Sequence, residues 1–197
     1  MKDTEKQLDV STSGPRTLIV FALIGTLVCG VLYPAIATLT GSALFASQAQ
    51  GSLISKNGVV IGSSLIAQQF SAPQYFQARP SAASFNPTAA SGSNWAPSNP
   101  ALRERMAATS AEISAREKRE VAAIPADLIS ASGSGLDPHI SPAAAYFQAD
   151  RIATARGLSV AQVRTQIDRH TEAPSLGVFG QARVNVLLLN LDLDQAE

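Results

Sequence analysis

A serine-rich stretch at residues 130–142, SASGSGLDPHISP, carries the residue types that hydrolytic chemistry requires. Ser132 and Ser134 offer hydroxyl nucleophiles, His139 offers a base, and Asp137 offers an acid that could orient the histidine. A serine hydrolase needs these groups in contact, together with donors that stabilise an oxyanion. The stretch has no Gly-x-Ser-x-Gly pattern, and an aspartate and a histidine two residues apart on a tight turn rarely point at each other. The spacing therefore argues against catalysis.

Turn and capping chemistry explains most of the same stretch. The Ser-Gly-Ser-Gly run permits a tight bend, because glycine adopts backbone angles that other residues avoid. A helix that began at Asp137 would place Pro142 one turn inside it, where the proline ring breaks the hydrogen-bond ladder. We therefore expect at most a single turn from Asp137 to Ile140, and a helix that begins at Ser141 and Pro142. This explanation leaves His139, and in part Asp137, without a role.

Other kinds of site find less support. Pro138 stands where a phosphate-binding Gly-x-Gly-x-x-Gly loop has its third glycine, and no Gly-Lys-Ser/Thr motif follows. His139 and His170 are the two histidines, and their separation, without a nearby cysteine, does not match the ligand spacing of a zinc site. We expect no catalytic residue, no bound cofactor and no metal in this chain.

The composition limits the class of protein. The chain has 197 residues, with 15 basic and 15 acidic side chains and a single cysteine. This length suits one ordinary domain, and without a basic excess there is no electrostatic footprint for nucleic acid. Cys29 lies inside an apolar run, so the rest of the chain has no thiol for a disulfide, a zinc site or a nucleophile.

The apolar run extends over residues 18–39 and contains no charge. As a helix, its roughly 22 residues would be about 33 Å long, enough to cross a hydrocarbon core of about 30 Å. Pro34 falls near the far end, where a kink is tolerated. We predict a transmembrane helix at 17–40, between a cytoplasmic tail at 1–16 and an exterior domain at 41–197.

A cleaved signal peptide is the alternative, because Ser-Gln-Ala at 47–49 resembles a cleavage site. The run exceeds the roughly 7 to 15 residues of a signal peptide core, and its N-terminal flank mixes acids with bases, so we favour a retained anchor. Lys2, Lys6 and Arg16 precede the helix, and no charge follows it before Lys56. The positive-inside rule then predicts a single-pass membrane protein with a cytoplasmic N-terminus and an exterior domain.

Small side chains recur along the predicted membrane helix. Ala22, Thr26 and Gly30 are four residues apart, which leaves a narrow stripe where a second helix can approach closely. Small residues are also common in any membrane helix. The stripe therefore permits a membrane partner without requiring one.

Helix and strand signals divide the exterior domain into short elements. Asn57-Gly58, between two apolar stretches, predicts a β-hairpin within 51–66. Apolar spacing and capping residues predict helices at 100–122, 141–156 and 159–171. The apolar run RVNVLLLNLDL at 183–193 predicts a strand buried on at least one face. We expect an α+β fold with about three helices and a small, mostly antiparallel sheet.

A long loop without helical or strand periodicity extends over residues 84–100 and is rich in Asn, Pro, Gly and Ser. Irregular loops of this length in a compact domain are usually functional or disordered. Trp95, a large aromatic side chain within the loop, indicates that the loop docks against another surface.

A series of short motifs, in order along nearly the whole chain, resembles the C subunit of the bacterial Kdp potassium-transporting ATPase. After the single N-terminal span, the motifs are GSSLIAQ at 62–68, YF at 75–76, RPSA at 79–82, SGSN at 91–94, PSNP at 97–100, PADL at 125–128, SGSGLDPHISP at 132–142, HTE at 170–172 and RVNV through LN at 183–190. Two positions depart from the family pattern: Trp95 stands where a small aliphatic residue is expected, and Ala67 where glycine is usual.

The resemblance implies a non-catalytic accessory subunit. In that family a channel-like potassium-binding subunit works with a P-type ATPase subunit that hydrolyses ATP through an aspartyl phosphate. The C subunit is needed for assembly and activity, and its proposed role is that of a catalytic chaperone that raises the ATP affinity of the pump. ATP and K⁺ would then be handled by the complex, and a periplasmic domain argues against direct ATP contact by this chain.

The resemblance also implies a single-pass protein of the bacterial inner membrane whose exterior domain is periplasmic. It implies contacts with both of those subunits and with membrane lipid. We expect the partner-facing residues to come from the helix stripe and from the exterior loops. The exterior candidates are Arg79, Asn94, Trp95, Asp137, His139 and Ser141. Two other classes stay open: an exported hydrolase tethered to the membrane, supported only by its Ser, Asp and His content, and a scaffold of another membrane complex.

Overall fold

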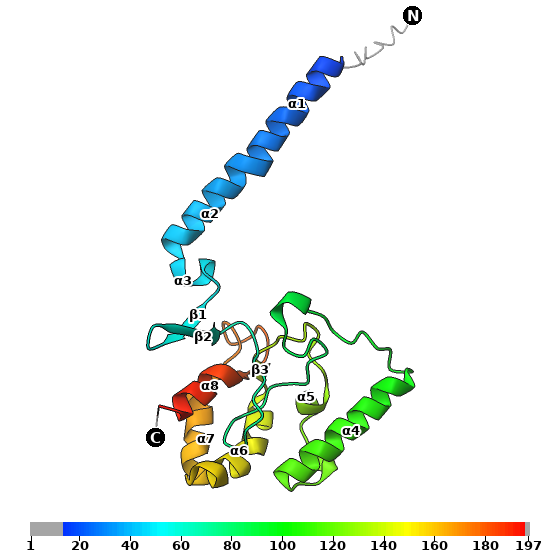
Figure 1. The fold of residues 1–197 in the computed structure, drawn as a ribbon, viewed down its shortest axis with the longest axis vertical. Coiled ribbons are helices and arrows are strands. Elements are labelled where there is room, and N and C mark those ends of the chain that lie inside the picture. Colours follow the sequence, from blue (N-terminus) through cyan, green and yellow to red (C-terminus); the bar gives the residue numbers. More distant parts are fainter. Residues whose placement is uncertain (1–13, 196–197) are drawn as a thin grey trace, which may run out of the picture. The chain divides into compact units, whose positions relative to one another are not determined.

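The computed structural model describes residues 14–195 and divides into two compact units after Gly51. One long helix dominates the first unit, whereas the second unit combines several helices with two small sheets (Figure 1). Most of the predicted tail at 1–16 lies outside the described residues. The mixture of helices and antiparallel sheets confirms the predicted α+β class.

The long helix of the first unit is continuous. It consists of α1 (Pro15–Leu27), the π-helical turn η1 (Val28–Leu32) and α2 (Tyr33–Leu44), and the short helix α3 (Ala46–Ala49) follows. Together the first three elements form 30 residues that are long and apolar enough to cross a membrane, and none of them is buried within the chain. The helix is longer than the predicted span at both ends and is consistent with a single-pass membrane protein.

The π turn has a cause in the sequence. Pro34 has no N–H to donate, and its ring crowds the carbonyl four residues earlier, which belongs to Gly30. The helix widens just before the proline, so that the Tyr33 N–H donates to the Val28 carbonyl five residues back. The local disturbance expected at Pro34 is therefore a wider turn within an unbroken helix.

The second unit begins with the β1–β2 hairpin, formed by β1 (Leu53–Lys56) and β2 (Val59–Ser63), which pair antiparallel. Asn57 and Gly58 at its turn have φ values of 53° and 77°. These left-handed angles are the ones that a two-residue type I′ turn requires, and asparagine and glycine adopt them most readily. The hairpin predicted from Asn-Gly is confirmed.

Three of the predicted helices are present, with their predicted caps. They are α4 (Pro100–Glu117), α6 (Pro142–Arg156) and α7 (Val160–Arg169). Side-chain oxygens of Asn99, Ser141 and Ser159 accept the first free backbone N–H groups of these helices. The shorter helical segments of the second unit are η2 (Pro87–Ala89), η3 (Val121–Ala123) and α5 (Ala126–Ile129).

The prediction that the first of these helices continues to Ala122 is wrong. α4 ends at Glu117 because Lys118 adopts a left-handed φ of 53°. The backbone N–H of Arg119 then turns back to the Ser114 carbonyl at 3.2 Å, which satisfies one of the last carbonyls of the helix. A glycine often marks such a helix end, and because this chain has Lys118 there, the sequence does not indicate where α4 ends.

The predicted strand at 183–193 is also wrong over most of its length. Only β5 (Arg183–Asn185) is extended, and the remainder forms the helix α8 (Val186–Leu193). The Asn185 side chain accepts the Leu188 N–H at 3.2 Å and caps this helix. α8 is buried on several sides, so its apolar residues show no helical period that would distinguish it from a buried strand.

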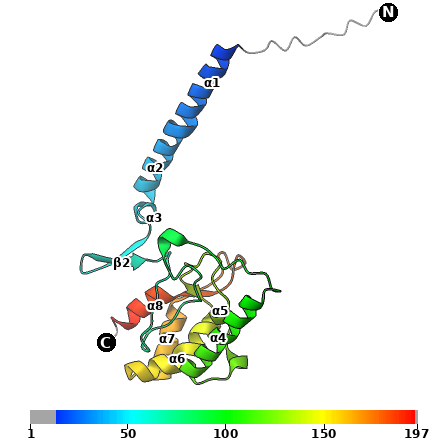
Figure 2. The ribbon, with the colours of Figure 1, turned by 45° about the vertical axis from the view of Figure 1, so that its right-hand side comes forward.

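The second sheet and the core lie next to α8. β5 is the middle strand between β3 (His139–Ile140) and β4 (Thr171–Glu172), and both pairings are antiparallel. In both ribbon views α6 lies between α4 and α7 (Figures 1 and 2). The core residues with no exposed surface include Phe76, Ile152, Val163, Ile167, Val184 and Leu189. The core therefore joins the sheet to α6, α7 and α8.

Asn185→Ala should destabilise the second unit by about 2 kcal/mol. The substitution removes the α8 cap and leaves the Ser64 carbonyl, which accepts from Asn185 Nδ2 at 2.8 Å, without its donor. Urea unfolding of the full chain in detergent, followed by Trp95 fluorescence, measures the loss. Asn86→Ala is the matched control, because Asn86 caps only the exposed turn η2 and its loss should cost about 0.5 kcal/mol or less. Equal losses for the two variants would contradict the role of Asn185.

Candidate functional site

Asp137 joins the candidate residues of the serine-rich stretch. Its Oδ1 accepts the backbone N–H of His139 at 3.0 Å and lies 3.1 Å from His139 Nδ1. Its Oδ2 lies 3.3 Å from Arg79 Nη1. The expectation that Asp137 and His139 do not point at each other is therefore wrong. In an Asx turn the aspartate carboxylate accepts the backbone N–H of the residue two positions later. Here that residue is His139, so the turn also brings the His139 imidazole beside the Asp137 carboxylate.

The two candidate nucleophiles of the stretch, Ser132 and Ser134, are used by the loop itself. Ser132 is 3% exposed, and its Oγ accepts the backbone N–H groups of Gly135 at 3.1 Å and Asp137 at 3.4 Å. Ser134 Oγ accepts the N–H of Leu136 at 3.1 Å. Within residues 14–195 no hydrogen bond joins either serine to His139. The arrangement therefore contains an Asp–His pair without a serine nucleophile bonded to it.

Two glycines allow the serine-rich stretch to pack against the long loop. Gly135 has a φ of 72°, and a Cβ there would lie 2.7 Å from the Ser91 carbonyl oxygen. A Cβ at Gly92 would lie 2.5 Å from the Gly133 carbonyl oxygen. Because these distances are too short for a side chain, only glycine permits the two backbones to meet. The SGSN and SGSG motifs are therefore two sides of one contact.

Ser141 and Asp127 fix the other end of the stretch. The backbone N–H of Ser141 donates to Asp127 Oδ2 at 2.7 Å, and its hydroxyl donates to Asp127 Oδ1 at 3.2 Å. The same hydroxyl accepts the Ala144 N–H and caps α6. Asp127, on α5, was not among the predicted site residues. Its place in the PADL motif gives no indication that it reaches Ser141, 14 residues away.

These side chains surround a polar hollow of about 320 Å³ on the surface of the second unit. Its lining includes Arg79, Asp127, Asp137, His139, Ser141 and Arg183. Arg79 Nε is buried and has no hydrogen-bond partner among residues 14–195, whereas Nη2 of the same side chain donates to the Ala131 carbonyl at 3.3 Å. Both signs of charge lie side by side, which suits a polar protein surface better than a single small ion.

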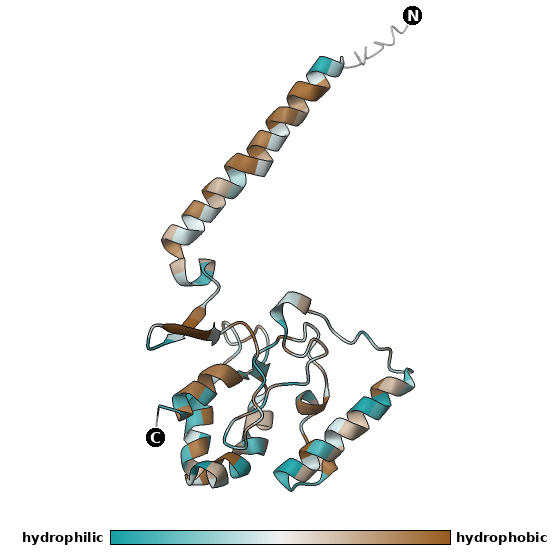
Figure 3. Ribbon diagram, viewed as in Figure 1, coloured by the Kyte–Doolittle hydropathy of each residue, from teal (hydrophilic) through white to brown (hydrophobic). Residues whose placement is uncertain are grey.

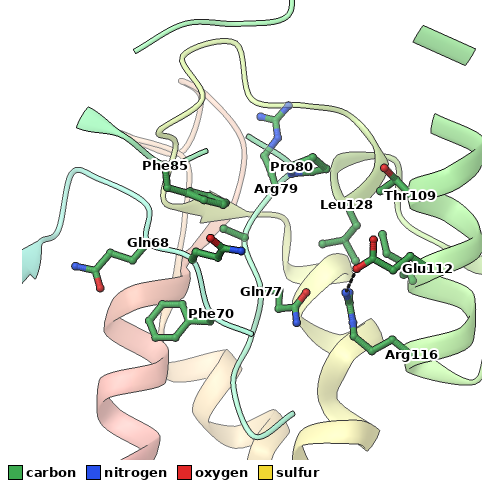
Figure 4. Close-up of a pocket in the computed structure, with 13 residues that line it drawn as sticks. Gln68, Phe70, Gln77, Arg79, Pro80, Phe85, Thr109, Glu112, Arg116 and Leu128 are labelled. Atoms are coloured by element: carbon green, nitrogen blue, oxygen red, sulfur yellow. Dashed lines mark ion pairs between the residues drawn. The ribbon is translucent and has the colours of Figure 1, made fainter. Parts of the chain in front are cut away.

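Arg79 also borders a second hollow, of about 200 Å³, between α4 and the segment that precedes Arg79 (Figure 4). Figure 4 shows the Phe70 and Phe85 rings on one side and the Glu112–Arg116 ion pair on the other. The Arg79 guanidinium points away from Gln77 and Phe70 in this view. The arginine thus lies at the boundary between the two hollows.

A buried network of polar side chains positions the chain just before Arg79. Glu117 and Arg151 have side chains 1% and 9% exposed and form an ion pair at 2.9 Å. Burial lowers the pKa of Arg151, and the Glu117 carboxylate opposes that shift. Arg151 donates to the Tyr75 carbonyl at 3.0 Å, and Gln148 bonds to both the N–H and the carbonyl of Gln77. None of the three side chains was predicted, because their partners are about 35 to 80 residues away in sequence.

Comparisons with known proteins match the sequence of this chain to one family. The model of the family described as "KdpC: K+-transporting ATPase, c chain" matches residues 16–195. The chain belongs to the KdpC family. The resemblance predicted from the motifs is therefore confirmed.

Three relatives illustrate the extent of the likeness, and each is named "Potassium-transporting ATPase KdpC subunit". The protein of Shewanella putrefaciens is 58% identical over 168 residues, which is 85% of this chain and 84% of the relative. The protein of Ralstonia nicotianae is 52% identical over 179 residues, 89% of this chain and 87% of the relative. The protein of Sorangium cellulosum is 50% identical over 184 residues, 92% and 97% of the two chains.

The structure of this KdpC-family chain brings some of the predicted site residues together. Arg79, Asp137, His139 and Ser141 line the polar hollow. Asn94, with a φ of 51°, and Trp95, 40% exposed, belong to the long loop that packs on the serine-rich stretch. The stripe of Ala22, Thr26 and Gly30 belongs to the first unit. Whether any of these residues contacts a partner stays a prediction.

A second feature of the site was not predicted. The apolar turn, residues 175–179, exposes Leu176 by 90%, Val178 by 75% and Phe179 by 65%. Ser175 and Phe179 exchange two backbone hydrogen bonds of 2.9 Å, and Leu176 adopts a left-handed φ of 54°. The turn is therefore built to display three apolar side chains close in sequence to the Gln181–Arg183 wall of the polar hollow. Its Leu-Gly-Val-Phe sequence, without charge, is the signal that could have indicated it.

No metal site is formed by the described part of the chain. Within residues 14–195 there is no group of three or more His, Cys, Asp or Glu side chains placed to hold an ion. His139 and His170 each face one aspartate, Asp137 and Asp192, at 3.1 and 3.2 Å. Each pair by itself offers fewer ligands than a stable site needs.

Gly135→Ala should destabilise the second unit by about 2 kcal/mol more than Gly157→Ala. Both glycines have positive φ, 72° and 66°, so both variants carry similar backbone strain. Nothing lies within 4 Å of a Cβ at Gly157, whereas a Cβ at Gly135 would displace the Ser91 backbone. Urea unfolding of both variants measures the difference, and Trp95 fluorescence of the folded Gly135 variant reports the displaced loop. Equal stability losses would contradict the proposed contact between the two loops.

Proposed function

We propose that this chain is a non-catalytic accessory subunit of an ATP-driven potassium-uptake complex. The observation that carries the proposal is the family match over residues 16–195, since the relatives are named subunits of a potassium-transporting ATPase. In this proposal the partners are a channel-like potassium-binding subunit, a P-type ATPase subunit and membrane lipid. The chain contributes to assembly and activity, and ATP and K⁺ are handled by the complex.

The polar hollow and the apolar turn provide the docking surface in this proposal. Asp137 holds Arg79 and His139 in fixed positions, so their remaining donors can meet a partner without further ordering. The apolar turn adds three exposed side chains that lose contact with water when a partner covers them. A polar patch next to an apolar anchor matches the usual anatomy of a protein interface.

The charge distribution supports a cytoplasmic N-terminus and a periplasmic second unit. Arg16 stands in the first turn of the long helix, and the segment between it and Lys56 has no charge. In this orientation the second unit is on the side of the membrane opposite to ATP. A rise in the ATP affinity of the pump would then be an allosteric effect, transmitted as a coupling free energy of about 1–3 kcal/mol between the two sides.

A membrane-tethered hydrolase is the second candidate, and the Asp137–His139 contact is the observation that favours it. The same pairing orients the base in a catalytic triad. Ser132, however, is buried and bonded to the loop backbone, so it cannot attack a substrate without the loop opening. The accessory-subunit proposal requires no such opening.

His139→Ala should reduce the fraction of assembled complex, and potassium-dependent ATP hydrolysis should fall in proportion to that fraction. Affinity purification of the complex and its ATPase rate provide the two measurements. His170→Ala is the matched control, because both histidines pair with an aspartate and their side chains are 24% and 25% exposed. The control should assemble normally. If His139→Ala assembled fully and turnover still fell by ~1000-fold, about 4 kcal/mol of barrier, the residue would participate in chemistry.

Alkaline phosphatase, a reporter that is active only in the periplasm, should be active when fused after Glu197. A reporter that requires the cytoplasm should be inactive there. The N-terminus of the mature chain should precede the long helix, since we propose that the helix is retained. Protein sequencing of the purified chain tests the second point. A mature N-terminus near Gln50, or a reporter active only in the cytoplasm, would contradict the proposed topology.

A further inference from the structure

The β1–β2 hairpin exposes more apolar surface than a free hairpin in water would retain. Leu53, Val59 and Val60 are 53%, 65% and 54% exposed. Figure 3 shows brown over much of both strands, and the polar colour lies around the turn and the end of β1 that leads into it. Exposed aliphatic side chains that gather on one element indicate a surface that is covered in the working state.

The rest of the second unit supports the hairpin through the second half of β2. Gln68 Nε2 donates to the Ile61 carbonyl at 2.7 Å, and Gly62 lies against Leu187 and Gln68. In the described part of the chain β1 and β2 form a two-stranded sheet and pair with no other strand. Because an isolated two-stranded hairpin is marginally stable in water, its outer half gains stability from any apolar surface that covers it.

The covalent connection keeps the hairpin near the membrane. Leu53 comes nine positions after Leu44, where α2 ends. Nine residues reach at most ~30 Å when fully extended, and the helical turn α3 within them shortens that reach. The apolar strands therefore stay within about the thickness of one membrane from the end of the long helix.

The charge of the hairpin suits lipid headgroups. Lys56 is the sole charged residue between Arg16 and Arg79, and it stands at the turn end of β1. An ammonium group on a long aliphatic stem can bind a lipid phosphate while its neighbours enter the boundary of the acyl chains. The apolar turn at 175–179 lacks a basic side chain and has no short tether, which fits a protein partner better.

We propose that the β1–β2 hairpin is a membrane-interface anchor: Leu53, Val59 and Val60 enter the boundary between headgroups and acyl chains, and Lys56 binds a lipid phosphate. The proposal rests on the retained membrane span of the proposed function and adds a second lipid contact to it. Such an anchor limits how the second unit can tilt and rotate about its tether. The docking surface is thereby held at a restricted height above the bilayer.

Two single-cysteine variants of the full chain test the anchor. In a Cys29→Ala background, Val60→Cys and Val121→Cys carry a nitrobenzoxadiazole label, and the native valines are 54% and 51% exposed. Each chain is reconstituted alone into vesicles of phosphatidylethanolamine and phosphatidylglycerol. The label at 60 should be quenched by nitroxide lipids and protected from iodide several-fold relative to the label at 121. Adding Lys56→Glu to the Val60→Cys chain should weaken that lipid quenching.

The outcomes separate this proposal from the one on which it rests. If the chain floats with the vesicles but iodide reaches positions 60 and 121 equally, the anchor is wrong and the membrane span stands. If position 60 is protected only in the complete complex, the hairpin docks on another subunit, which also overturns the anchor. If the chain fails to float, both the membrane span and the anchor are wrong.

Discussion

The candidate site depends on the contacts that the Asp137 carboxylate makes with His139 and Arg79. One oxygen closes the turn to His139 and the other holds Arg79, so two motifs that are distant in sequence meet at a single side chain. Arg79 also donates to the Ala131 carbonyl, so the same side chain binds the serine-rich stretch at a second point. Replacement of this carboxylate would leave a partly buried arginine and a histidine without their shared partner, which costs more than the loss of one exposed ion pair.

That central contact is held in place by two different kinds of support. The buried Glu117–Arg151 pair and Gln148 fix the backbone around Gln77, two residues before Arg79. On the other side, the glycine contact between the two loops leaves no room for the serine-rich stretch to shift. A buried ion pair adds little net stability to a fold. We therefore infer that the Glu117–Arg151 pair serves to select one backbone path for the segment that it binds. The result is a rigid surface that a partner can bind without ordering it first.

The sequence predicted most of the local structure, because caps and turns act over a few residues. The hairpin turn follows from Asn57-Gly58, and the starts of α4 and α6 follow from their capping residues, Asn99 and Ser141. Long-range effects were not predictable in the same way. α8 is an apolar run whose period is hidden by burial on several sides, and Asp127 and Arg151 find partners that no local pattern indicates. Four of the predicted site residues line one hollow, and their role stays a prediction, whereas the Asp–His contact among them was not expected.

The central claim is that the second unit of this KdpC-family chain acts by docking. Hydrogen–deuterium exchange of the full chain, alone and within the purified complex, tests the claim most directly. Assembly should slow exchange in three segments together: the serine-rich stretch at 130–142, the long loop around 91–95 and the apolar turn at 175–179. Protection confined to the long helix at 15–44, with these three segments exchanging at the same rate in both states, would contradict it.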